Sequence, residues 1–71
     1  MNDVMHSLAH KVESTIMEDD DLQDYEIDVL DSNGVITLRG LVPTREARDK
    51  AEAIARQIEG VTSVINELDV I

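Results

Sequence analysis

Two short stretches, residues 25–30 and 35–41, alternate between aliphatic and polar side chains. A period of two indicates a half-buried strand, so this pattern predicts two strands with one face toward the core. The aliphatic positions that would share this face are Ile27, Val29, Ile36 and Leu38.

The residues between the two stretches predict a β-hairpin. Asn33-Gly34 suits a type I′ turn, which needs positive φ at both central residues. A two-residue loop would place Val29 opposite Leu38, whereas a four-residue loop over 31–34 would place it opposite Ile36. Both registers keep the same aliphatic residues on one face.

Two other segments show the helical period of apolar residues. The first covers residues 3 to about 18, with Asn2 or Asp3 as the N-cap. The second covers residues 44–59, with Thr44 as the N-cap and Gly60 as the C′ residue. Expected buried positions are Met5, Leu8, Ala9, Val12 and Ile16 in the first helix, and Ala47, Ala51, Ile54, Ala55 and Ile58 in the second.

Residues 61–71 predict a third strand. Val64, Leu68 and Val70 share one side of it and are expected to face the core, because the other side carries two charges. Asn66 would then lie near the core and need backbone or water partners. On the second strand, Gly40 shares the core face, which suggests either a bulge or a close approach to its backbone, by a helix.

The predicted order is therefore α-β-β-α-β in a single domain spanning residues 1–71. One sheet face is expected to be apolar and the other polar, so both helices should cover the same face. The expected class is α+β, an αββαβ two-layer sandwich with a three-stranded mixed sheet. The crossover through the second helix should be right-handed and leave the third strand parallel to the second.

Charge narrows the range of partners. The net charge is −10, and residues 1–38 hold ten acidic residues against one base, Lys11. Such a chain is expected to avoid nucleic acid.

The chain has no Cys and no apolar run long enough to span a membrane. With no signal-peptide pattern at the N-terminus, we expect a cytoplasmic protein if Met1 is the native start, and an envelope protein if the chain is cut from a secreted parent.

Two groups of residues are candidate metal sites. The acidic run could supply oxygen ligands to a loosely bound cation, although the EF-hand spacing is missing. Its members are Glu18, Asp19, Asp20, Asp21 and Asp24. His6 and His10 are spaced i, i+4 on the first helix and could share a metal. The alternatives are a solvated acidic loop and two surface histidines.

The second helix carries the candidate binding residues for an anionic lipid or a partner. They are Arg45, Arg48, Lys50 and Arg56. The alternative is a solvated face with i, i+4 ion pairs, namely Arg45–Asp49, Arg48–Glu52 and Glu52–Arg56. No catalytic residue and no cofactor are expected, since the serines lack a sequence context that would activate them.

Two motifs in the chain resemble the BON domain, named for bacterial osmotically induced and nodulation proteins. They are Asn33-Gly34-Val35-Ile36-Thr37-Leu38-Arg39-Gly40-Leu41-Val42 and Gly60-Val61-Thr62-Ser63-Val64-Ile65-Asn66-Glu67-Leu68-Asp69-Val70. The resemblance implies the αββαβ fold and a structural role for the motif glycines, aliphatic residues and Asn66.

The same resemblance implies a non-enzymatic module that interacts with proteins or phospholipids, mostly in the bacterial envelope and in stress responses. One branch of the family is linked to potassium binding. We therefore expect a protein-binding or accessory domain of a larger assembly. The alternatives are phospholipid-surface binding through the second helix and potassium or calcium sensing through the acidic loop.

Overall fold

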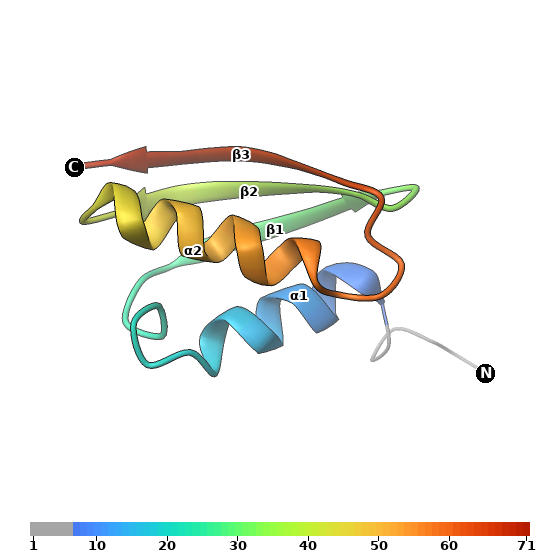
Figure 1. Ribbon diagram of the computed structural model, residues 1–71, viewed down its shortest axis with the longest axis horizontal. Coiled ribbons are helices and arrows are strands. Elements are labelled where there is room, and N and C mark those ends of the chain that lie inside the picture. The colour runs from blue at the N-terminus through green and yellow to red at the C-terminus, as the bar shows by residue number, and fades with distance from the viewer. Residues whose placement is uncertain (1–6) are drawn as a thin grey trace.

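The computed structural model describes residues 7–71 and has the predicted element order (Figure 1). The elements are α1 (Leu8–Met17), β1 (Ile27–Ser32), β2 (Val35–Val42), α2 (Arg45–Arg56) and β3 (Ser63–Val70). Both helices lie on one side of the sheet, which confirms the two-layer α+β sandwich.

The sheet has the order β1-β2-β3, with β1 antiparallel and β3 parallel to the central β2. Val29 lies opposite Leu38, so the hairpin has the two-residue loop. Asn33 and Gly34 have φ values of 54° and 88°, as a type I′ turn requires. The local turn chemistry therefore sets the register of the β1–β2 pair.

The first helix begins later than predicted. Ser7 is extended and its side chain accepts a hydrogen bond from the His10 amide, so Ser7 is the N-cap and the predicted start at residue 3 is wrong. The proposed caps Asn2 and Asp3 lie outside the described residues, as do Met5 and His6. The amides in the first turn of a helix have no partner within the helix, and a serine at the N-cap accepts a hydrogen bond from one of them, so serine strongly favours the start of a helix.

The second helix begins as predicted and ends earlier. Thr44 Oγ1 accepts from the Ala47 amide at 3.1 Å, which confirms this N-cap. The last turn tightens after Arg56, where Gln57 donates to the Ile54 carbonyl. Gly60 is therefore not the C′ residue of α2. It lies in the following turn with a φ of 101°, so glycine is still favoured there.

The strand boundaries shift by one or two residues from the predicted ones. On β3, Leu68 is buried and Val64 is half-buried, as expected for inward positions. Val70 shares their side of the strand but is 40% exposed, so its predicted burial is wrong. It lies at the end of β3, in an edge strand, where the helix layer covers it incompletely.

The core lies between the sheet and the two helices. Its buried members are Val12, Ile16, Leu22, Ile27, Ile36, Leu38, Val42, Ala47, Ala51, Ala55 and Leu68. The three alanines of α2 are buried as predicted, whereas Ile54 and Ile58 are only partly buried. Leu22 is fully buried although the acidic run surrounds it, so this segment is not a simple solvated loop.

Gly40 is approached by a strand and not by a helix. It has a φ of 139°, and a Cβ at this position would collide with the main-chain oxygen of Glu26. The predicted close approach is confirmed, but the approaching group is the backbone that leads into β1. Gly40 lies opposite Ile27, so the glycine lets the two strands meet at this point.

Candidate functional site

The acidic run makes its main contact with α2. Lys50 Nζ lies 3.0 Å from Asp19 Oδ1 and 2.8 Å from Asp21 Oδ2. The Asp21 amide also donates to Asp19 Oδ1 at 2.9 Å. This amide, and then the Lys50 ammonium, hold the pKa of Asp19 below its ordinary value. An ammonium group from the same chain thus balances two carboxylates of the run.

The five candidate cation ligands do not converge. Asp20 accepts a hydrogen bond from Gln23, and Glu18 is the C-cap of α1. Within residues 7–71, no three His, Cys, Asp or Glu side chains come together in an arrangement that could hold a metal ion. The predicted His6–His10 pair cannot be placed, because His6 lies outside the described residues.

The basic residues of α2 are mostly paired with acidic residues of the same chain. Besides Lys50, Arg56 Nη2 lies 2.7 Å from Glu52 Oε2, as predicted, and Arg48 Nε lies 3.6 Å from Asp49 Oδ1. Arg45 makes no ion pair with any residue in the described range 7–71.

Two of the predicted i, i+4 ion pairs of α2 are wrong. Neither Arg45–Asp49 nor Arg48–Glu52 forms among the described residues. Arg48 turns to the adjacent Asp49, and Glu52 is engaged by Arg56 and by Asn66 of β3.

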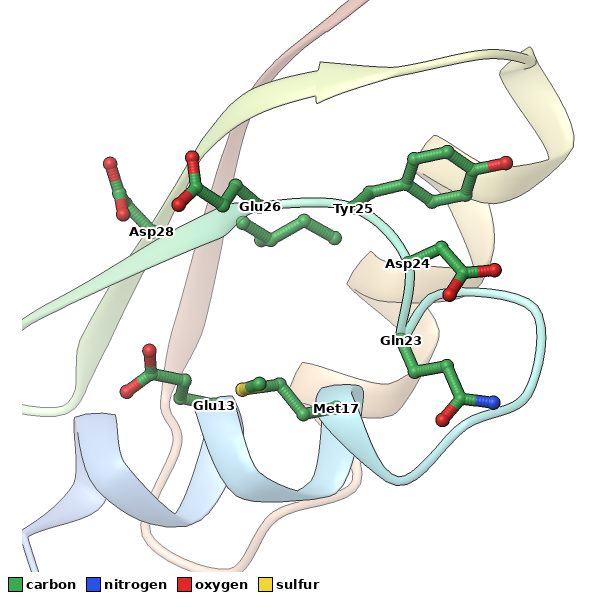
Figure 2. Close-up of a pocket in the computed structure, with 8 residues that line it drawn as sticks. Glu13, Met17, Gln23, Asp24, Tyr25, Glu26 and Asp28 are labelled. Atoms are coloured by element: carbon green, nitrogen blue, oxygen red, sulfur yellow. The ribbon is translucent and has the colours of Figure 1, made fainter.

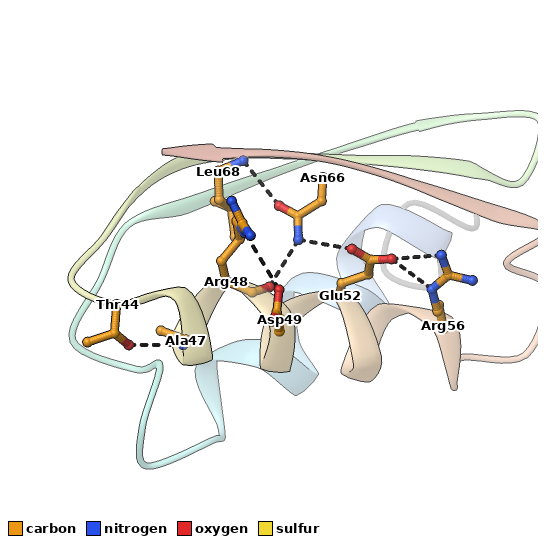
Figure 3. Close-up of polar contacts among 8 residues, drawn as sticks. All are labelled: Thr44, Ala47, Arg48, Asp49, Glu52, Arg56, Asn66 and Leu68. Atoms are coloured by element: carbon orange, nitrogen blue, oxygen red, sulfur yellow. Dashed lines mark hydrogen bonds and ion pairs between the residues drawn. The ribbon is translucent and has the colours of Figure 1, made fainter. Parts of the chain in front are cut away.

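Asn66 links β3 to α2 (Figure 3). Its Nδ2 donates to the Arg48 carbonyl at 3.0 Å and to Glu52 Oε1 at 3.2 Å, while its Oδ1 accepts from the Leu68 amide at 3.1 Å. Hydrogen bonds from Arg56, and then from Asn66, lower the pKa of Glu52. The expected need of Asn66 for a backbone partner is confirmed.

The sheet face away from the helices is not wholly polar, contrary to the prediction. Leu30, Leu41 and Ile65 point to this side and are each about half exposed. Between them Arg39 Nε lies 2.9 Å from Glu67 Oε1, across two paired strands. We call this the open sheet face. It combines exposed apolar side chains with a charge pair that is already satisfied.

A groove lies between α1 and the start of β1 (Figure 2). It measures about 270 Å³, and its lining residues are Glu13, Met17, Gln23, Asp24, Tyr25, Glu26, Ile27 and Asp28. Glu13 and Met17 rise from α1, and Glu26 and Asp28 stand on the strand side. We call this the β1 groove. Sequence reasoning missed it because its residues come from two elements and the loop between them.

Ser14 and His10 form a weak side-chain contact on α1. Ser14 Oγ lies 3.4 Å from His10 Nε2, and both groups are at the protein surface. Among residues 7–71 no carboxylate bonds to His10, so the third member of a catalytic triad is missing from the described chain. The contact is an exposed i, i+4 pair.

A family model described as the BON domain matches residues 6–71, almost the whole chain. The chain belongs to the BON domain family. This agrees with the αββαβ order and with the positions of the two motifs. In this BON domain, the motif glycines Gly34, Gly40 and Gly60 all have positive φ, and Leu38 and Leu68 of the motifs are buried.

Two curated proteins are similar to this BON domain. One is "Outer membrane lipoprotein DolP" of Haemophilus influenzae, 35% identical over 65 residues, which are 90% of this chain and 34% of that protein. The other is "Osmotically-inducible protein Y" of Escherichia coli K12, 31% identical over 64 residues, which are 90% of this chain and 32% of that protein. The chain thus spans about a third of the length of the curated relatives it matches. Among the described residues, no helix is long and apolar enough to cross a membrane.

Proposed function

We propose that this BON domain is a non-catalytic module that binds another protein or a neighbouring domain through its open sheet face. The observation that carries this proposal is the exposure of Leu30, Leu41 and Ile65 on the face of the sheet that neither α1 nor α2 covers. Exposed apolar side chains grouped around a polar element are typical of protein–protein contact surfaces. The Arg39–Glu67 pair can enter such a contact with its own charges already paired, whereas Asp28 and Asp69 on the same side would need basic groups from the partner.

The length of the relatives supports the same proposal. In both curated relatives the matched segment is joined to about two further lengths of chain. A module that is normally part of a longer protein has neighbouring segments available for contact.

A phospholipid surface is less well supported as the partner. Binding to an anionic leaflet relies on unpaired basic residues, each contributing about 1 kcal/mol near the surface. Of the four candidates, Lys50 and Arg56 are in close ion pairs, and Arg48 is near Asp49. The net charge of −10 adds a general repulsion.

Cation sensing by the acidic run is also less well supported. Lys50 already supplies positive charge to Asp19 and Asp21, so a metal would have to displace it. In addition, the five carboxylates do not form a shared ligand shell in residues 7–71.

Photo-crosslinking in the cells that produce the protein tests the proposal. A photoreactive amino acid at Leu41 or Ile65 should give discrete protein adducts, and the same group at the exposed Glu59, in the turn between α2 and β3, should not. Introducing Leu30→Asp should suppress the adducts made at Leu41. Equal adducts from all three positions would contradict the proposal.

Sedimentation with phosphatidylglycerol vesicles separates the lipid alternative. We expect no binding at physiological salt. Binding that disappears in an Arg45→Glu, Arg48→Glu variant would support the lipid surface instead.

A further inference from the structure

The free edge of β1 carries unpaired backbone groups. β1 is an outer strand of the sheet, and its hairpin closes through a two-residue type I′ loop. Hydrogen-bonded and non-bonded pairs alternate from the loop onward, starting with the bonded pair Ser32–Val35. The N–H and C=O groups of Ile27 and Val29 therefore point away from β2, toward the free edge. Within residues 7–71, no hydrogen bond outside the sheet engages them.

The β1 groove lies along this edge. Its floor includes Met17, which is 55% exposed, beside the buried Ile27 and the partly exposed Tyr25. An extended segment paired with β1 would place alternate side chains over Met17 and the others on the opposite side of the sheet. The groove thus offers both backbone partners and an apolar contact for the same segment.

The charges around the groove select its occupant. Glu13, Asp24, Glu26 and Asp28 line it, and none of them is in an ion pair with any other residue of the described chain. Of the residues that the structure describes, 7–71, no basic side chain lines the groove. A basic segment would gain from these carboxylates, and acidic segments would be repelled. A second copy of this chain, with its own net charge of −10, is disfavoured for the same reason.

We propose that the β1 groove binds an extended basic segment of a partner protein, which adds to the sheet as a fourth strand beside β1. Backbone hydrogen bonds to Ile27 and Val29 hold the segment, an aliphatic side chain or the stem of a Lys covers Met17, and basic groups meet the carboxylates. This site is separate from the apolar residues of the open sheet face, so either proposal can fail without the other.

Fluorescence anisotropy with a labelled peptide of alternating Lys and Val, about as long as β1, tests the inference. The peptide should bind, and its affinity should fall as the salt concentration rises. The same peptide with Glu in place of Lys should not bind. A Lys-Val peptide N-methylated at alternate residues, on the edge that would pair with β1, cannot form the backbone hydrogen bonds to β1. Its affinity should therefore be lower by about tenfold or more.

Charge-reversal variants locate the site. Glu13→Lys with Glu26→Lys should weaken peptide binding by about tenfold or more. Glu59→Lys with Asp69→Lys changes the net charge equally at exposed positions outside the groove and should weaken it much less. Thermal melts of both variants establish that each is folded.

Amide hydrogen exchange supplies an independent readout. The Ile27 and Val29 amides should exchange more slowly when the Lys-Val peptide is bound. Three results would overturn the inference: equal weakening in both charge-reversal variants, equal binding of the N-methylated peptide, or unchanged exchange at these amides. Protection of the same amides by self-association, seen as a dimer in sedimentation without peptide, would also overturn it.

Discussion

The side-chain amide of Asn66 lies 3.0 Å from the main-chain oxygen of Arg48, so one residue of β3 is bonded directly to the backbone of α2. The same side chain also accepts from the Leu68 amide. Asn66 therefore fixes how the helix sits on the edge strand. Replacing the Asn66 side chain should therefore loosen the packing of α2 against β3.

We expect Asn66→Ala to lower the free energy of unfolding by about 1 to 2 kcal/mol, because partly buried groups lose their hydrogen-bond partner. Urea denaturation measures this change. Asn66→Asp should cost more at neutral pH, since it places a carboxylate beside Glu52, and this extra cost should shrink in acid. Equal stability of the Asp and Ala variants at neutral pH would contradict the assigned contact with Glu52.

Leu22 should behave as a core residue despite its acidic neighbours. Its side chain is fully buried, so we expect Leu22→Ala to cost about 2 to 5 kcal/mol in unfolding free energy. Leu30→Ala, on the open sheet face, is the matched control and should cost much less. Similar losses in the two variants, measured by urea denaturation, would show that the loop does not seal the core.

Gly40→Ala should destabilise the protein more than Gly60→Ala. Both positions have positive φ, which costs about 1 to 3 kcal/mol for a residue with a side chain. At Gly40 the new Cβ also collides with the Glu26 main-chain oxygen, whereas at Gly60 the nearest atom is Leu8 Cδ1 at 3.4 Å, an ordinary contact. Thermal denaturation compares the two, and an equal loss would rule out the main-chain collision.

The hydrogen bond from the Asp21 amide to Asp19, together with the ion pair of Asp19 with Lys50, should make stability depend on pH in the acidic range. The pKa of Asp19 is lowered on folding, so its contribution is present above the ordinary value of 3.8 and is lost as the pH falls through the lowered value. The wild type should therefore exceed Asp19→Asn in stability at pH 7, and the difference should vanish in strong acid. Asp69→Asn, at a position with no ion pair in residues 7–71, is the control. Denaturation across the pH range measures the difference, and one that stays constant with pH would contradict this assignment.

The parts of the fold governed by short-range chemistry could be predicted from the sequence. The turn preference of Asn33-Gly34 and the capping preference of Thr44 act over a few residues, so they determine the hairpin and the start of α2 wherever they occur. The predicted start of α1 is wrong because several residues that can cap a helix lie near one another in the sequence, and the N-cap in the structure is Ser7.

Features that depend on residues distant in the sequence could not be predicted from the pattern of apolar and polar residues. The burial of Leu22, the approach of the Glu26 main chain to Gly40 in place of the predicted helix, and the pairing of Lys50 with the acidic run each join segments far apart in the chain. The β1 groove belongs to the same class, because it exists only where α1 passes the free edge of a strand. Periodicity assigns a residue to a face but does not say what covers that face.

The parallel alignment of β3 with β2 also sets the order in which the sheet can assemble. β1 and β2 close through a local loop and need little chain to be organised first. β3 can pair with β2 only after the crossover segment that contains α2 has returned the chain to the end of the sheet where β2 begins. In a growing polypeptide the hairpin residues therefore emerge before β3, and Leu68 can join the core only once β3 has paired with β2.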